Sequence, residues 1–180
     1  MKGEKNLESS KRERILYSRE DISTRIKELG QIISESYKDK DLLVVSLLRG
    51  SFIFTADLVR ELSIPVEVDF MTTASYGHDE ISSGIVDIVH DIRAKAEGKD
   101  ILIVDDIMDS GYTLKKVKEV LSQKNPRSIK ICVLLDKPSR RKVDLEPDFV
   151  GFTIPDVFIV GYGLNYGDHF RNIPYIFTFD

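Results

Sequence analysis

The sequence predicts an α/β fold in which a mostly parallel, twisted sheet is flanked by helices on both sides. Short, nearly continuous apolar runs, typical of strands buried on both faces, alternate with amphipathic segments of helical period. No internal repeat or Gly/Ser-rich linker divides the chain, so residues 1–180 are expected to form a single domain. Ligands of such a sheet are expected at the carboxyl ends of its strands.

The first half of the chain contains two predicted helices and two predicted strands. A capping-box pattern at residues 18–21 precedes a helix whose apolar positions recur at helical spacing, namely Ile22, Ile26, Leu29, Ile33 and Tyr37. Residues 42–48 predict a buried strand. Ser51 is expected to cap a second helix that ends at about residue 62, and residues 66–72 predict the next strand.

The second half continues this alternation and then loses it. Residues 101–105 predict a third buried strand, residues 112–124 a helix, and residues 129–135 a fourth strand. The tail that follows is rich in proline and has no long helical period, so we expect a small C-terminal hood lobe rather than another βαβ unit. The core would then span about residues 16–137, and the hood about residues 138–180 together with the N-terminal arm.

Composition restricts the possible functions. The chain has 30 acidic and 26 basic residues and a net charge of −4, which argues against non-specific binding of nucleic acid. The single cysteine, Cys132, excludes an intrachain disulfide and a multi-cysteine zinc site. The apolar runs are too short to span a bilayer, and the first residues do not look like a signal peptide. We therefore expect a cytoplasmic protein with no membrane partner.

The strongest functional motif is the run VDDIMDSGYTL at residues 104–114. Asp105 and Asp106 follow buried apolar residues, and paired carboxylates there suit sugar hydroxyls and a hydrated Mg²⁺. The amides and hydroxyls of residues 110–113 lie at a predicted helix N-terminus, which favours a monophosphate. Asp109 or Ser110 could simply cap the helix. Capping does not explain three acids within five residues after a buried strand.

This run resembles the 5-phosphoribosyl-1-pyrophosphate (PRPP) signature of type I phosphoribosyltransferases, and the acid at Asp109 resembles their hypoxanthine-guanine branch. The resemblance covers nearly the whole chain after about residue 15, with further blocks at residues 47–51, 74–77, 134–141 and 158–164. It implies the type I phosphoribosyltransferase fold and a role in purine salvage. The implied reaction is Mg²⁺-dependent transfer of 5-phosphoribosyl from PRPP to N9 of hypoxanthine or guanine, with release of pyrophosphate.

The resemblance assigns roles to the residues of the motif. Asp105 and Asp106 would hold the ribose hydroxyls, directly or through Mg²⁺, and Asp109 would accept the N7 proton of the purine. The 5′-phosphate would be bound by Ser110, Gly111, Tyr112 and Thr113. Asp105 stands where the family more often has Glu, a change that keeps the charge but alters its reach.

The pyrophosphate end of the site is implied by separate blocks. Arg49 and Gly50 would bind pyrophosphate in a loop that in the family contains a non-proline cis peptide, and Arg171 would bind it from the hood. The family usually has Lys at the position of Arg49, and the two side chains are not interchangeable in a tight loop. Ser75 and Tyr76 would close over the reacting centre and exclude water.

The purine would be bound by the remaining blocks. Lys137 would donate to O6 and so select 6-oxopurines over adenine, Phe158 would stack on the ring, and Ile159 would present backbone groups to its edge. After residues 161–164 the family normally has Asp, which helps to bind a second Mg²⁺. Here Asn165 occupies that position, so we expect a weaker second metal site.

Two other interpretations remain open at this level. A protein with the same fold could bind PRPP or RNA as a regulator without turnover. A response-regulator receiver also has paired acids, but near its first strand rather than its third. The sequence does not rank hypoxanthine, guanine and xanthine, and the family suggests a homodimer or homotetramer.

Overall fold

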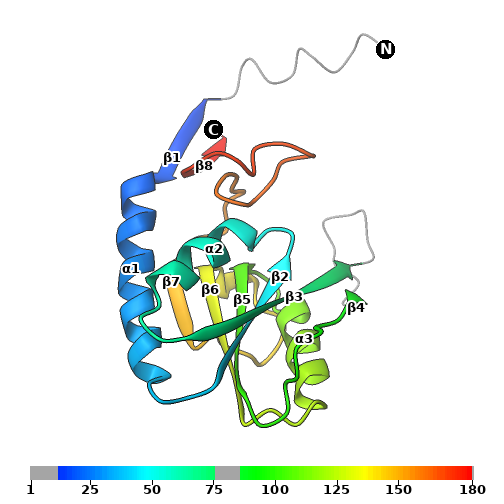
Figure 1. Cartoon of the computed structure of the whole chain (residues 1–180). Coiled ribbons are helices and arrows are strands. Elements are labelled where there is room, and N and C mark those ends of the chain that lie inside the picture. Colours follow the sequence, from blue (N-terminus) through cyan, green and yellow to red (C-terminus); the bar gives the residue numbers. More distant parts are fainter. Residues whose placement is uncertain (1–11, 76–85, 180) are drawn as a thin grey trace.

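The computed structural model describes residues 12–75 and 86–179 (Figure 1). Its centre is a six-stranded sheet of order β4-β3-β2-β5-β6-β7, in which only the β3–β4 pair is antiparallel. The predicted mostly parallel α/β fold is therefore confirmed. The strands are β2 (Leu42–Leu48), β3 (Val66–Ser75), β4 (Val86–His90), β5 (Asp100–Met108), β6 (Ser128–Asp136) and β7 (Phe149–Thr153).

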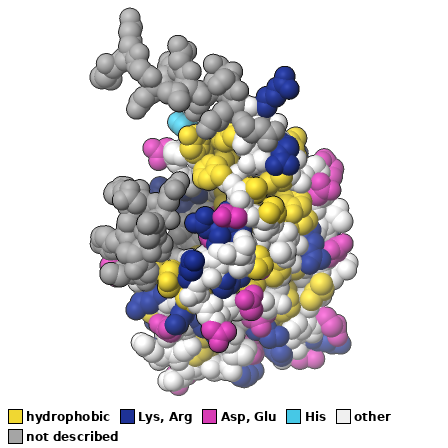
Figure 2. All heavy atoms as spheres, turned by 180° about the vertical axis from the view of Figure 1, so that it is seen from behind, with side chains coloured by type: hydrophobic (Ala, Val, Ile, Leu, Met, Phe, Trp, Pro, Cys, Tyr) yellow, Lys and Arg dark blue, Asp and Glu magenta, His cyan; other side chains and the backbone are white. Residues whose placement is uncertain are grey.

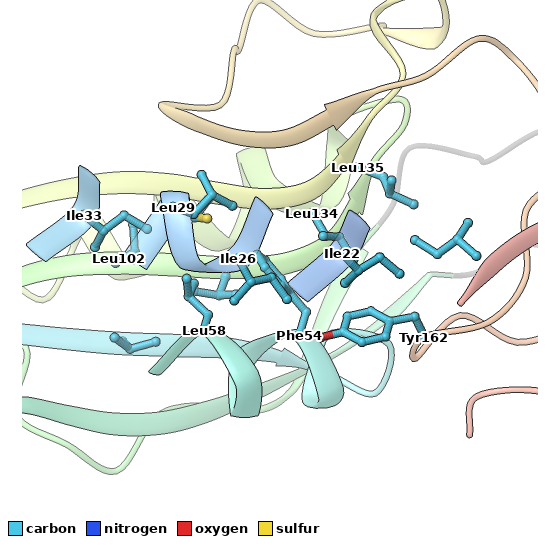
Figure 3. Packing of buried hydrophobic residues seen from close by; sticks show 14 of the residues in the cluster. Ile22, Ile26, Leu29, Ile33, Phe54, Leu58, Leu102, Leu134, Leu135 and Tyr162 are labelled. Carbon is cyan, nitrogen blue, oxygen red and sulfur yellow. The ribbon is translucent and has the colours of Figure 1, made fainter. Parts of the chain in front are cut away.

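Helices cover both faces of the sheet, as predicted. Helices α1 (Arg19–Ser36) and α2 (Phe52–Glu61) pack on one face, and α3 (Tyr112–Ser122) packs on the other. The buried residues of α1 recur at helical spacing and meet Phe54 and Leu58 of α2 above Leu102 and Leu134 of the sheet (Figure 3). No helix of the described ranges is both long and apolar enough to cross a membrane.

The two predicted helix starts have different outcomes. At α1 the capping box is present, because Ser18 Oγ accepts from the Asp21 amide and the Asp21 carboxylate accepts from the Ser18 amide. Ser51 does occupy the N-cap position of α2, but its side chain makes no capping hydrogen bond. It is fully buried, and its Oγ donates instead to the carbonyl of Leu47, 2.6 Å away. The predicted side-chain cap is therefore wrong, because this hydroxyl holds the end of β2.

The tail after Leu135 differs from the expectation. The segment Phe149–Thr153 joins the main sheet as β7, parallel to β6, so the view that the whole tail lies outside the sheet is wrong. The connection from β6 contains only the short 3-10 helix Pro138–Arg140, and it has no helical period to indicate a crossover. The buried end of β6 nevertheless needs a pairing partner, and β7 provides one.

A small hood lies above the carboxyl ends of the strands (Figure 1). It contains a two-stranded antiparallel ribbon, in which β1 (Glu13–Tyr17) pairs with β8 (Ile176–Phe179). The segment that follows the N-terminal arm thus pairs with the C-terminal end of the described chain. The hood faces the sheet edge at which the parallel strands end.

Two adjacent isoleucines of α1 test this packing. Ile33 is fully buried, whereas Ile32 is 50% exposed. We expect Ile33→Ala to lower the free energy of unfolding by about 2–5 kcal/mol, because it removes buried contacts and leaves a cavity. The matched Ile32→Ala should change it by no more than about 0.5 kcal/mol. Urea unfolding measures both, and equal effects would contradict the assigned face of α1.

Candidate active site

The carboxyl ends of β2, β5 and β6 meet beneath the hood. The three strands are parallel and in register, with Ser46 opposite Val104 and Val104 opposite Cys132. The loops and residues that end them therefore gather at one edge of the sheet (Figure 1). These are the segments that carry most of the predicted site residues.

Asp105 and Asp106 form a carboxylate pair at this edge. They lie within β5, which continues to Met108, and not at its last residue as the sequence suggested. The Asp105 carboxylate accepts from the Asp106 amide, and the Asp106 carboxylate accepts from the Ile107 amide, each at 3.0 Å. No Lys or Arg of the described residues lies within 4.0 Å of either carboxylate.

Burial determines the electrostatics of this pair. It raises the pKa of both carboxyl groups, and the charge of Asp106 raises the pKa of Asp105 further. Two backbone hydrogen bonds and the positive charge of Arg171 act in the opposite direction on Asp106. Two hard oxygen donors, one buried and one partly buried, with no Lys or Arg of the described residues within 4.0 Å, fit a divalent cation such as Mg²⁺.

The loop after β2 approaches the acid pair through its backbone. The peptide bond between Leu48 and Arg49 is cis, as the resemblance implied. A Cβ added to Gly50 would lie 1.8 Å from Asp106 Oδ2, so any side chain at this position would displace the loop or the Asp106 carboxylate. On the hood, a Cβ added to Gly163 would lie 2.2 Å from the Gly50 carbonyl. Sheet, loop and hood therefore meet through two glycines.

A cavity of about 240 Å³ lies at the end of β5. Ser110, Gly111 and Thr113 line it together with residues 105–109, so the predicted phosphate loop and acid pair face one space. Gly111 precedes α3 with φ of 86°, a left-handed conformation that glycine adopts without strain. Tyr112 was predicted to contact the phosphate with these residues, but it does not line the cavity.

Four charged residues, which we call the charge cluster, lie beyond the phosphate loop. Lys137 follows β6, and its Nζ lies 3.9 Å from Asp156 Oδ1. Arg140 Nε lies 3.0 Å from Asp109 Oδ1, and the same guanidinium lies 3.3 Å from Asp156. Burial lowers the pKa of Lys137, and the negative charge of Asp109 opposes this shift. Asp109 therefore lines the cavity at the end of β5 and lies close enough to the buried Lys137 to affect its pKa.

The hood presents aromatic and polar groups beside this edge. Phe158 is 57% exposed and contacts Tyr166 edge to face, with ring centroids 5.6 Å apart, while the neighbouring Ile159 is buried. Hydrophobic side chains gather in the upper part of the face that Figure 2 shows, at the level of the hood. Arg171 Nη1 donates to the Gly163 carbonyl at 2.6 Å, and the exposed Asn165 donates to the Gly167 carbonyl.

Comparisons with known proteins agree with this arrangement. The sequence profile of the phosphoribosyl transferase domain matches residues 15–167. The chain belongs to the phosphoribosyltransferase family. It is 53% identical over 158 residues to the hypoxanthine phosphoribosyltransferase of Salmonella typhimurium, with 87% of this chain and 89% of that protein covered. It is 47% identical over 164 residues to the hypoxanthine-guanine phosphoribosyltransferase of Bacillus subtilis, with 91% of each covered.

Solved structures of this family share the fold. A hypoxanthine phosphoribosyltransferase from Staphylococcus aureus aligns with a TM-score of 0.89 and 42% sequence identity, covering 93% of this chain and 91% of that one. The family assignment excludes the receiver interpretation, and no comparison favours a regulator without turnover.

Two predicted contacts to a phosphoribosyltransferase substrate fall at the limit of the described residues. Tyr76 lies outside them, in the range 76–85 that the structure does not describe, and Ser75 is the last residue of β3. Sequence reasoning also missed two members of the charge cluster, Arg140 and Asp156. Arg140 lies in the run DKPSRR, one of the blocks that resemble the family, and this position was the one signal that could have indicated its role.

The contact between Gly50 and Asp106 can be tested by one substitution. Gly50→Ala should lower kcat/KM by about 100-fold or more, because the methyl group displaces either the loop or the carboxylate by about 1 Å. Gly98→Ala is the control for backbone strain without a clash: its φ of 73° disfavours alanine, but a Cβ there meets nothing within 4 Å, so kcat/KM should stay near wild type. Steady-state phosphoribosyl transfer measures both variants. Full activity of Gly50→Ala would contradict the close approach.

Proposed function

We propose that this chain is a purine-salvage enzyme that transfers 5-phosphoribosyl from PRPP to N9 of hypoxanthine or guanine, giving IMP or GMP and pyrophosphate. The observation that carries the proposal is the place of Asp109, which lines the phosphate cavity and also faces the charge of Lys137. A proton acceptor at that place lies between a bound sugar phosphate and a bound base. The names of the relatives support the same substrates.

The sugar phosphate is bound at the end of β5. Ser110, Gly111 and Thr113 bind the 5′-phosphate with their amides and hydroxyls, and the start of α3 adds the favourable end of a helix dipole. Asp105 and Asp106 address the ribose hydroxyls and hold Mg²⁺, and Asn165 offers an amide oxygen to a second ion. When bound, Mg²⁺ supplies positive charge that stabilises the departing pyrophosphate.

The chemical step separates charge at the anomeric carbon. The bond from C1′ to the pyrophosphate oxygen breaks, purine N9 forms a bond to C1′, and Asp109 accepts the proton from N7. Arg49 and Arg171 hold the leaving pyrophosphate, and the Gly50 backbone keeps the loop of Arg49 against Asp106. Ser75 and Tyr76 close over the centre and exclude water, which would otherwise hydrolyse PRPP.

The base is selected by polar contacts. Lys137 donates a hydrogen bond to the purine O6, a contact that adenine, with an amino group there, does not accept. Phe158 stacks on the ring from the hood, and Ile159 presents its backbone to the base edge. A cytoplasmic location remains a prediction from the sequence, and a homodimeric or homotetrameric assembly remains a prediction of the family resemblance.

A turnover assay with each base tests this function. With PRPP and Mg²⁺, the chain should release pyrophosphate with hypoxanthine or guanine and not with adenine. Asp109→Asn should lower kcat by about 100- to 10,000-fold, because the general base is lost. Asp156→Asn, which removes the other carboxylate beside Arg140, should keep most of the activity. Full activity of Asp109→Asn with every base would refute the proton-acceptor role.

The amide at Asn165 predicts a Mg²⁺ dependence that one substitution can shift. Asn165→Asp adds a negative charge to an oxygen donor of the second metal site, so the Mg²⁺ concentration at half-maximal rate should fall by about 3-fold or more. Asn125→Asp adds the same charge in the turn after α3, far in sequence from every predicted site residue, and serves as the control. An equal fall in the half-maximal Mg²⁺ concentration in both variants would show an effect of net charge alone and would contradict a metal-binding role for Asn165.

A further inference from the structure

Arg141 is a buried arginine that the reaction described above does not use. Its side chain is only 8% exposed. It follows the 3-10 helix after β6 and reaches back to the residues that precede the phosphate loop. One nitrogen, Nη1, donates to the Asp109 carbonyl at 2.6 Å and to the Met108 carbonyl at 3.3 Å. The other, Nη2, donates to the Asp136 carboxylate at 2.5 Å.

These contacts determine the direction of the loop amides. A peptide unit is planar and trans, so its carbonyl and the following N–H point in opposite directions. The Asp109 carbonyl is held by Arg141, and the Ser110 carbonyl accepts from the Lys142 amide at 2.9 Å. The N–H groups of Ser110 and Gly111 therefore point away from residues 141–142. Neither N–H donates to an acceptor within the described parts of the chain.

The loop also packs directly on the same segment. A Cβ added to Gly111 would lie 3.2 Å from Arg141 Cδ and 2.6 Å from Val143 Cγ2. The carbonyl side of the loop is thus filled by residues 141–143, while Ser110 and Gly111 line the 240 Å³ cavity. Successive N–H groups that share one direction form a concave site for an anion.

The ion pair with Asp136 is not explained by stability alone. Both side chains are buried, at 8% and 6% exposed, and such a pair contributes little net free energy because both charges lose their hydration. Asp136 directly precedes Lys137, and the Lys137 amide donates to the Met108 carbonyl at 2.9 Å. Arg141 therefore ties the end of β6, which carries the base-binding lysine, to the start of the phosphate loop.

We propose that Arg141 is a positioning residue that holds the Ser110 and Gly111 amides toward the 5′-phosphate. It does not touch the substrate and acts only through the carbonyls of Met108 and Asp109. This inference rests on the proposed function of the phosphate loop. A purely structural ion pair would stabilise the fold without a specific effect on phosphate binding, and this difference can be measured.

Two ligands that differ only by the phosphate isolate the effect. Isothermal titration calorimetry of the full chain measures the dissociation constants for IMP and for inosine. The dissociation constant for inosine divided by that for IMP reports the contribution of the phosphate. Asp136→Asn removes the ion pair and keeps the Arg141 donors, so the ratio should stay within about 3-fold of wild type. Asp136→Asn combined with Arg141→Met removes the donors without leaving an unpaired buried charge, and should lower the ratio about 10-fold or more.

The following results would contradict the inference. If the double variant keeps the ratio, or loses affinity for both ligands equally, Arg141 has only a structural role. If the wild-type chain binds IMP no more tightly than inosine, the phosphate loop itself is wrongly assigned, and the proposed function fails with it. Arg141→Lys covers the case in which the double variant does not fold. It keeps the charge beside Asp136, but its single amine does not reproduce the planar fork, and it should also lower the ratio.

Discussion

The shared register of β2, β5 and β6 is the constraint on which the site depends. Each strand has fully buried residues on both faces, and a slip of one residue would turn every side chain to the opposite face. The packing of the core against α1, α2 and α3 therefore determines where each strand ends. As a consequence of that packing, one edge of the sheet brings together the loop after β2, the segment after β6 and the acids near the end of β5.

The part of this edge proposed to bind pyrophosphate is assembled through backbone more than through side chains. Gly50 lies against Asp106, and Gly163 lies against the Gly50 carbonyl. Arg171 then donates to the Gly163 carbonyl, and its charge opposes the burial that raises the pKa of Asp106. A carbon atom added at either glycine would displace its neighbour, so the loop, the hood and the acid pair are held close together. Burial disfavours the charge of Asp105, and the same burial would favour a divalent cation bound by the pair in the proposed function.

Local patterns in the sequence predicted the fold better than the site. The spacing from Ile22 to Tyr37 and the capping box are signals within one segment, and the structure confirms both. The strand β7 has five residues after an irregular connection, so no period marks it. Arg141 acts on a loop more than thirty residues earlier in the chain. Such a contact exists only after β5 and β6 have paired, and a sequence pattern cannot show it.

Asp109 and the loop that follows it differ in how firmly the rest of the structure holds them. Asp109 and Arg140 are 41% and 43% exposed, and an ion pair in contact with solvent contributes at most about 1 kcal/mol. In the proposed mechanism, Asp109 would therefore give up Arg140 and accept the N7 proton of a purine at little cost. The phosphate loop is held instead by a buried guanidinium and by a backbone hydrogen bond from Lys142. A rigid anion site beside a lightly paired proton acceptor suits a reaction in which the sugar phosphate must stay fixed while the base gives up its proton.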